Sequence, residues 1–147
     1  MVNSQVHCEF DASALERRAD LTIPGEVGAI APAVEEIMGS VRAMGCAAGK
    51  EFEIEIALTE ALANAVEHGC AKDPGKRVEV WAGCDHERGV LIVVRDPGPG
   101  FDPAQVPSPV VGELIYREGG RGIYLINRLM DHVSYERGGA EIRMIKR

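Results

Sequence analysis

Three polar side chains recur at intervals of four residues in the apolar segment Glu55–His68. They are Glu60, Asn64 and His68, and residues four apart project from the same face of a helix. Asparagine is a poor helix former that prefers caps, so propensity does not explain Asn64. A carboxylate and an amide oxygen one turn apart can ligate a hard cation such as Mg²⁺, and the carboxylate can instead act as a general base. The same spacing is typical of a solvent-exposed helix face, and taken alone it favours that interpretation.

A second candidate group follows the β-branched run Val90–Val94. The strand that this run predicts ends on Asp96, and a turn containing Gly98 and Gly100 comes next. Asp96 can accept a hydrogen bond from an exocyclic amine, and the two glycines allow a flat ring to lie against bare backbone. Asp-Pro-Gly is also among the commonest turn sequences, so the pattern alone does not decide between a turn and a binding site.

A third group is the glycine-rich segment Gly119–Gly122, which directly precedes the helical spacing of Ile123–Asp131. Free N–H groups in a first helical turn, together with the positive end of the helix dipole, form an anion site. Arg117 and Arg121 would add charge for phosphate oxygens. The segment is neither a P-loop nor a dinucleotide fingerprint, because it has no Gly-Lys-Ser/Thr ending and follows a loop rather than a strand. A hinge without a ligand is the alternative that remains open.

Apolar periodicity predicts the elements that must position these groups. Helices are expected over Glu26–Met44, with Pro32 near the first turn and Gly45 as the stop, over Lys50–His68 and over Gly122–Asp131. Strands are expected over Ala19–Ile23, Arg77–Cys84, Val90–Val94, His132–Glu136 and Glu141–Ile145, and weak alternation permits an edge strand over Val6–Phe10. Residues 101–119 have no period and predict a functional lid. The order indicates a single α+β domain over residues 1–147, a two-layer sandwich whose mixed, mostly antiparallel sheet has helices on one face.

Composition narrows the classes of function. The chain has 147 residues, 46% of them hydrophobic, and a formal net charge of -7, which argues against a direct nucleic-acid partner. No signal peptide and no membrane span is visible, so we expect a cytoplasmic protein without a membrane partner. In a reducing cytoplasm its four cysteines are expected to be free thiols. The His68-x-Cys70 and Cys84-x-His86 pairs could suggest zinc, but their spacing matches no common zinc motif.

Taken together, the three groups resemble the N, G1 and G2 boxes of the GHKL ATPase superfamily in both order and spacing. The matching residues are Glu60-x-x-x-Asn64-Ala-x-x-His68-Gly69, Asp96-x-Gly98-x-Gly100-Phe101 and Gly120-x-Gly122. The segments ALTEALANAVEHG, VVRDPGPGFDP and GGRGIYLINRLMD are similar to those of anti-sigma serine kinases of the RsbW and SpoIIAB type. The resemblance covers the chain from about Leu21 to its end and implies the histidine-kinase-like (Bergerat) ATPase fold.

The resemblance implies a role for each group. Glu60 would orient or deprotonate the attacking hydroxyl as the catalytic residue, Asn64 would be the protein ligand of Mg²⁺, and Asp96 would hold the adenine amine of ATP. The lid would close over the triphosphate. The residues assigned in this way to the nucleotide are Asn64, His68, Asp96, Gly98, Gly100, Phe101, Arg117, Gly119, Gly120, Arg121, Gly122 and Ile123.

The resemblance also implies a reaction and partners. The reaction would transfer the γ-phosphoryl group of ATP to a serine or threonine of a STAS-domain anti-sigma factor antagonist, and the chain would also sequester a sigma factor or another regulator as a homodimer. One residue departs from the narrower kinase group, in which an arginine shortly before the glycine loop contacts the terminal phosphate. Here Glu118 falls near that place, between Arg117 and Arg121. The alternative is therefore a non-catalytic regulator whose partner binding depends on nucleotide.

Overall fold

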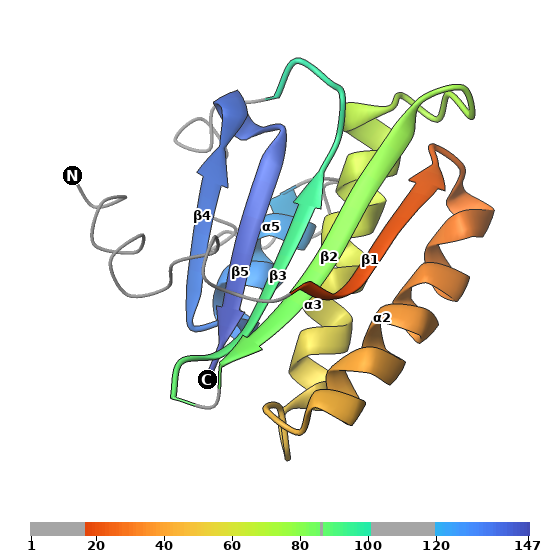
Figure 1. Cartoon of the computed structure of the whole chain (residues 1–147). Coiled ribbons are helices and arrows are strands. Elements are labelled where there is room, and N and C mark those ends of the chain that lie inside the picture. The colour runs from red at the N-terminus through yellow and green to blue at the C-terminus, as the bar shows by residue number, and fades with distance from the viewer. Residues whose placement is uncertain (1–16, 86, 101–119) are drawn as a thin grey trace.

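The structure is a computed structural model that describes residues 17–85, 87–100 and 120–147. This part of the chain forms a five-stranded sheet in the order β1-β2-β3-β5-β4, in which every neighbouring pair is antiparallel. Figure 1 shows β3 in the middle of the sheet, with β1 and β4 at its two edges. The strands are β1 (Arg17–Pro24), β2 (Arg77–Asp85), β3 (Gly89–Arg95), β4 (His132–Glu136) and β5 (Glu141–Lys146).

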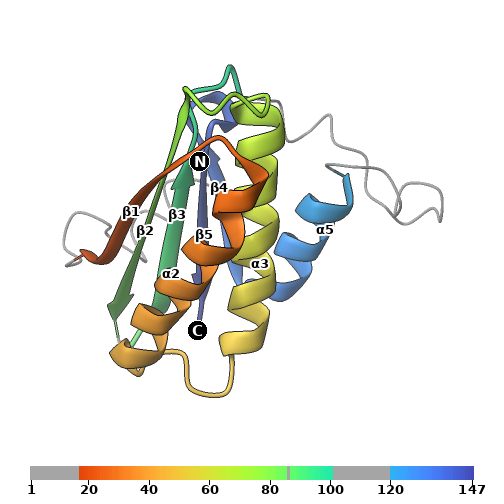
Figure 2. The same ribbon diagram turned by 90° about the vertical axis from the view of Figure 1, so that its right-hand side faces the viewer.

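Three α-helices in the described part cover one face of this sheet (Figure 2). They are α2 (Ile30–Met44), α3 (Glu51–Asn64) and α5 (Gly120–Leu129). α3 lies between the other two and contacts both. It can therefore bury one side against the sheet and present another side to α5. No helix of the described residues is long and apolar enough to cross a bilayer.

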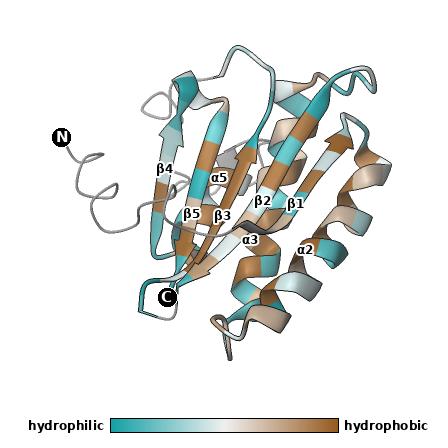
Figure 3. Cartoon of the chain, in the orientation of Figure 1, coloured by the Kyte–Doolittle hydropathy of each residue, from teal (hydrophilic) through white to brown (hydrophobic). Residues whose placement is uncertain are grey.

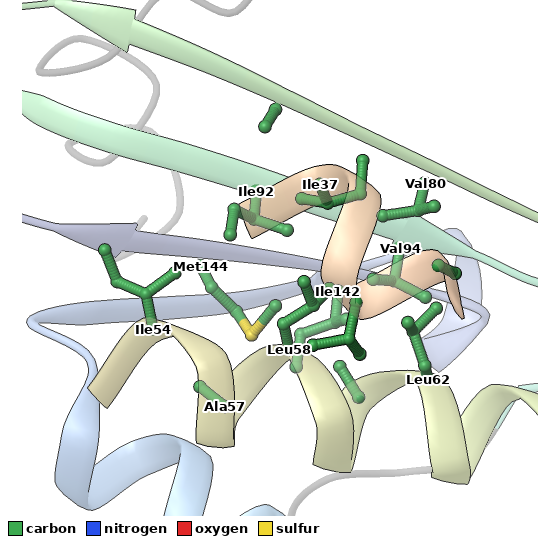
Figure 4. Close-up of a cluster of buried hydrophobic side chains, with 14 of the residues drawn as sticks. Ile37, Ile54, Ala57, Leu58, Leu62, Val80, Ile92, Val94, Ile142 and Met144 are labelled. Atoms are coloured by element: carbon green, nitrogen blue, oxygen red, sulfur yellow. The ribbon is translucent and has the colours of Figure 1, made fainter. Parts of the chain in front are cut away.

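The core lies between the helices and the sheet, as Figure 4 shows. Hydropathy follows the same arrangement in Figure 3, where β3, in the middle of the sheet, is apolar along most of its length. β3 is buried on both faces along almost its whole length, which explains its continuous β-branched run. Each large apolar side chain buried here stabilises the fold by about 1.5–3 kcal/mol. The side chains that meet at the centre of the core are Ile37, Ile54, Leu58, Leu62, Val80, Ile92, Val94 and Met144.

These elements confirm the predicted α+β fold, with differences at helix ends. α5 spans Gly120–Leu129 rather than Gly122–Asp131. The first helix begins at Ile30 rather than Glu26, because residues 27–29 form a separate 3-10 turn, η2. Pro32 falls in the first turn, where its missing N–H is not needed, and Gly45 ends the helix with a φ of 75°. The strand expected over Val6–Phe10 and the lid over 101–119 lie outside the described residues.

A further difference is at the end of α3, which continues as a π-helical turn, η3 (Ala65–Gly69). The Cys70 N–H donates to the Ala65 carbonyl over 2.8 Å, one residue further back than an α-helical bond. Ala71 and Lys72 then take positive φ values of 51° and 57°. The extra residue in the turn shifts the end of this helix relative to the regular spacing that the sequence predicts.

The prediction of free cysteines is wrong for two of the three cysteines in the described residues. Cys46 and Cys84 form a disulfide, whereas Cys70 is free and fully buried. Cys46 follows the end of α2 and Cys84 lies near the end of β2, so they are 38 residues apart in the chain. Spacing alone could not reveal this pair, because it depends on the packing of the α2–α3 loop against the sheet.

Candidate functional site

The polar side of α3 faces the beginning of α5. The core takes Leu58, Ala61 and Leu62 from α3, which leaves Glu60 and Asn64 half-buried at the rim. A Cβ placed on Gly122 would lie 3.0 Å from Glu60 Oε2 and 3.3 Å from Asn64 Nδ2. The structure therefore brings together the predicted carboxylate, the predicted amide and the backbone of the first turn of α5.

Neither of these two α3 side chains is engaged by another residue in the part of the chain that the structure describes. Among the described residues, the Glu60 carboxylate and the Asn64 amide make no hydrogen bond and no ion pair. Next to them, the first turn of α5 supplies backbone N–H groups that no preceding helical carbonyl can satisfy. This combination is suited to an anionic ligand with an associated cation.

Glu60, Asn64 and the start of α5 form one wall of the candidate site. Asp96 lies at a second wall, where the end of the π-turn meets the end of β3. An added Cβ on Gly69 would overlap the Asp96 carboxylate, and one on Gly98 would lie 2.6 Å from the Gly69 carbonyl oxygen. The Gly98 N–H donates to Asp96 Oδ1 over 2.8 Å, and the Asp96 N–H donates to the Ala140 carbonyl over 2.9 Å. The backbone of Gly69 and Gly98 thus surrounds this carboxylate, and only glycine fits at these two positions. The Ala140 carbonyl holds the backbone of Asp96.

The environment of Asp96 affects its ionisation. Burial raises the pKa of Asp96, and the hydrogen bond from Gly98 only partly opposes this effect. Asp96 Oδ2 accepts no hydrogen bond from any described residue. The site therefore contains a partly desolvated carboxylate oxygen that can accept a hydrogen bond from a ligand.

A group of ion pairs, formed by Arg95, Glu141 and Arg143, adjoins Asp96 in the sheet. Arg95 and Glu141 are opposite each other on β3 and β5, and Arg95 Nη2 is 2.6 Å from Glu141 Oε1. Arg143 Nε donates to the other oxygen of Glu141 over 2.9 Å. Burial alone would raise the pKa of Glu141, but its hydrogen bonds and charge interactions with Arg143 and Arg95 outweigh burial and lower it. No sequence pattern predicts this group, since it depends on strand register.

The remaining predicted site residues that the structure describes lie on the π-turn and on α5. His68 is exposed on the π-turn, and Gly120 and Arg121 begin α5. Ile123 is half-buried in the same helix. The predictions for Phe101, Arg117 and Gly119 lie outside the described residues.

Gly100 and Gly69 make contacts within the protein that the sequence motifs did not predict. Gly100 has a φ of 79°, and an added Cβ there would overlap the Gly138 carbonyl in the β4–β5 turn. Contact with the protein thus already requires glycine at this position, and its contact with a flat ring stays a prediction. Gly69 enters the sequence analysis only as the last residue of the first motif, and nothing in its sequence context distinguishes it from an ordinary glycine at a helix C-terminus.

The fold is that of the histidine-kinase-like ATPase class. A family model described as "Histidine kinase-like ATPase domain" matches residues 23–146, and the chain belongs to this family. Membership implies that the domain binds ATP.

Among curated proteins, the chain is similar to serine-protein kinases named RsbW. It is 32% identical to that of Bacillus subtilis (strain 168) in an alignment 132 positions long, which covers 78% of this chain and 81% of the relative. It is 30% identical to that of Bacillus velezensis in an alignment 136 positions long, which covers 86% of this chain and 83% of the relative. The homology is distant but extends over most of both chains.

Proposed function

We propose that this chain is an ATP-dependent serine/threonine protein kinase that also acts as an anti-sigma factor in a partner-switching system. Its substrate would be a STAS-domain antagonist, and its second partner a sigma factor or another regulator. The names of the relatives support the kinase activity. The observation that carries the proposal is that Glu60 and Asn64, which no other described residue engages, lie against Gly122.

Glu60 and Asn64 of α3 would have different roles in phosphoryl transfer. ATP supplies the γ-phosphoryl group. Glu60 would accept or orient the proton of the attacking hydroxyl, and Asn64 would offer its amide oxygen to Mg²⁺. No group of three His, Cys, Asp or Glu side chains that could hold a metal occurs in the described residues. Asn64 as a single protein ligand is still compatible with Mg²⁺, because Mg²⁺ usually relies on one or two protein ligands, water and substrate phosphates. Positioning and charge neutralisation would provide most of the catalysis.

The Asp96 wall would bind the base of the nucleotide. Asp96 Oδ2, which accepts no hydrogen bond from a described residue, would accept one from the exocyclic amine of adenine. The first turn of α5, Gly120–Gly122, would direct its N–H groups to the phosphates, with the segment 101–119 as the lid. We further propose that the chain is a single domain, acts in the cytoplasm and forms a homodimer.

One sequence observation favours a second function. Glu118 falls near the position at which the kinase group has a phosphate-contacting arginine. A carboxylate there would repel the terminal phosphate, which disfavours transfer more than binding. The alternative is therefore a regulator that binds partners in a nucleotide-dependent manner without phosphorylating them.

Calorimetry and a phosphotransfer assay distinguish these possibilities. Mg-ATP titrations would compare the wild type with Asn64→Ala, and transfer from labelled ATP would be measured on STAS-domain proteins of the same organism. Glu60→Gln should retain ATP binding and lower the transfer rate by about 10²–10⁴-fold. Glu53→Gln, at the other end of α3, is the matched control and should leave both unchanged. Binding without transfer by the wild type would favour the non-catalytic regulator, and no binding would refute both.

A further inference from the structure

The disulfide joins the helix layer to the sheet at the end of α3 remote from the candidate site. Cys46 lies in the loop that leads from α2 into α3, and Cys84 lies on β2 opposite Val90 of β3. Their Cα atoms are 6.2 Å apart, within the usual range for disulfides. Both residues are only half-buried, so small reagents in solution can reach them.

The third described cysteine differs from this pair in its burial and in having no disulfide partner. Cys70 is fully buried and unpaired. Burial raises its pKa, and the nearby Asp96 raises it further. Buried thiols with raised pKa values are poor nucleophiles. Among the described cysteines, only Cys46 and Cys84 therefore combine access with a partner within bonding reach.

We propose that Cys46 and Cys84 form a reversible redox modification site that reacts with low-molecular-weight disulfides. A thiolate of the pair attacks such a disulfide, R–S–S–R, which gives a mixed disulfide and releases one RS⁻. The second cysteine thiolate then attacks the sulfur of its partner, which forms the intramolecular bond and releases a second RS⁻. Two protein thiols are oxidised, one small disulfide is reduced to two thiols, and the reverse reaction opens the link. In the cytoplasm proposed above, disulfides are usually transient or redox-sensing.

The position of the Cys46–Cys84 disulfide in the fold determines which parts of the protein its formation stabilises. The 38-residue separation encloses the whole of α3, the π-turn and most of β2, so oxidation restrains the unfolded chain over a long loop. It also holds the segment before α3 against the sheet, where Ala47 is buried in the core. Asn64 lies at the opposite end of the 14-residue α3, about 20 Å along the helix axis from its first residue. Oxidation should therefore stabilise the fold and the α2–α3 loop without altering the site.

A glutathione redox titration of the full chain tests the proposal. After alkylation and non-reducing digestion, mass spectrometry should detect a peptide linking Cys46 to Cys84 that appears and disappears reversibly with the ratio of oxidised to reduced glutathione. The oxidised protein should unfold about 5–10 °C higher than the reduced protein. It should also show slower amide exchange over residues 44–53, and Mg-ATP affinities within about twofold, since the link is remote from the site.

Two variants act as controls for these measurements. Cys46→Ser/Cys84→Ser should lose the redox dependence of the unfolding temperature, while Cys70→Ser should retain it. Comparison of oxidised and reduced wild type needs no variant, so a misfolded variant cannot obscure the result. The absence of the linked peptide at every ratio, or equal unfolding temperatures of the two forms, would overturn the proposal. Neither result depends on ATP binding, so the test is independent of the proposed function.

Discussion

At the scale of single residues, the candidate site depends on two glycines that leave no room for a side chain. Gly69 lies against the Asp96 carboxylate, and Gly98 lies against the backbone of Gly69. The hydrogen bond from the Gly98 N–H to Asp96 Oδ1 closes the arrangement. One carboxylate oxygen is thereby fixed by the protein, which leaves the other for a ligand.

Gly69→Ala tests this arrangement. The added methyl group must displace the Asp96 side chain, so we expect ATP affinity to fall by about tenfold or more, the loss of a hydrogen bond to a charged group. The matched control is Gly39→Ala, an exposed position in the middle of α2 where a Cβ meets nothing within 4 Å. That change should stabilise the fold by about 0.5–1 kcal/mol and leave affinity unchanged. Unaltered calorimetric affinity of Gly69→Ala would show that Asp96 does not contact the nucleotide.

Asp96→Asn separates binding from stability. Because the pKa of Asp96 is raised in the folded state, its contribution to stability is full at low pH and is lost as pH rises through that pKa. Asparagine removes the charge that burial disfavours, so the variant should unfold at the same or a higher temperature than the wild type at pH 7. This difference should vanish at acidic pH, where the wild-type carboxyl is protonated.

Calorimetry supplies the other half of the Asp96→Asn prediction. Affinity for ATP should fall by about ten- to hundredfold, because asparagine presents an N–H₂ group or a weaker acceptor to the adenine amine. A variant that is destabilised at pH 7 but binds ATP normally would contradict both parts of the argument.

At the scale of elements, strand register holds the Asp96 turn in place. The pair formed by Arg95 and Glu141 connects β3 to β5 immediately before Asp96 and immediately after Ala140. Glu141 is only 1% exposed, whereas Arg95 and Arg143 are more exposed. A buried carboxylate with two charged partners is costly to disrupt by removing one member.

Glu141→Gln should therefore destabilise the fold by about 1–3 kcal/mol at pH 7. Because the pKa of Glu141 is lowered in the folded state, its stabilisation is present above the ordinary glutamate value of about 4.3 and is lost as pH falls through the lowered pKa. The gap between wild type and variant should thus narrow in acid. Glu79→Gln is the control: this exposed carboxylate lies 3.7 Å from Arg95, and its loss should cost less than about 1 kcal/mol. Equal unfolding temperatures for both variants would contradict the expectation.

Sequence periodicity predicted those elements whose burial repeats along the chain. The apolar stripe of α3 and the continuous run of β3 both reflect burial against immediate neighbours. The π-turn, the Arg95–Glu141 pair and the Cys46–Cys84 disulfide depend instead on segments that are distant in sequence. The motif order indicated which residues meet, but not that Gly69 would fix the orientation of Asp96.

At the scale of the whole molecule, the two walls of the site come from different layers. Glu60 and Asn64 belong to the helix layer, with α5 beside them, whereas Asp96 and Gly98 continue from the middle strand of the sheet. A nucleotide that contacts both walls would connect these layers. Because it would bind the folded chain and not the unfolded one, it should stabilise the entire domain.

Thermal unfolding with Mg-ATP at about 100 times its dissociation constant should therefore show a gain of about 2.7 kcal/mol, or roughly 5–10 °C. In Asn64→Ala, the Mg²⁺-dependent part of this shift should disappear, so that Mg-ATP and ATP with a chelator give the same smaller shift. Asn127→Ala is the matched control, because Asn127 is an exposed asparagine on α5 whose amide donates to the Ile123 carbonyl. A full Mg²⁺-dependent shift in Asn64→Ala would mean that the ion is held by the phosphates alone, and Asn64 would then belong to the protein surface rather than to the site.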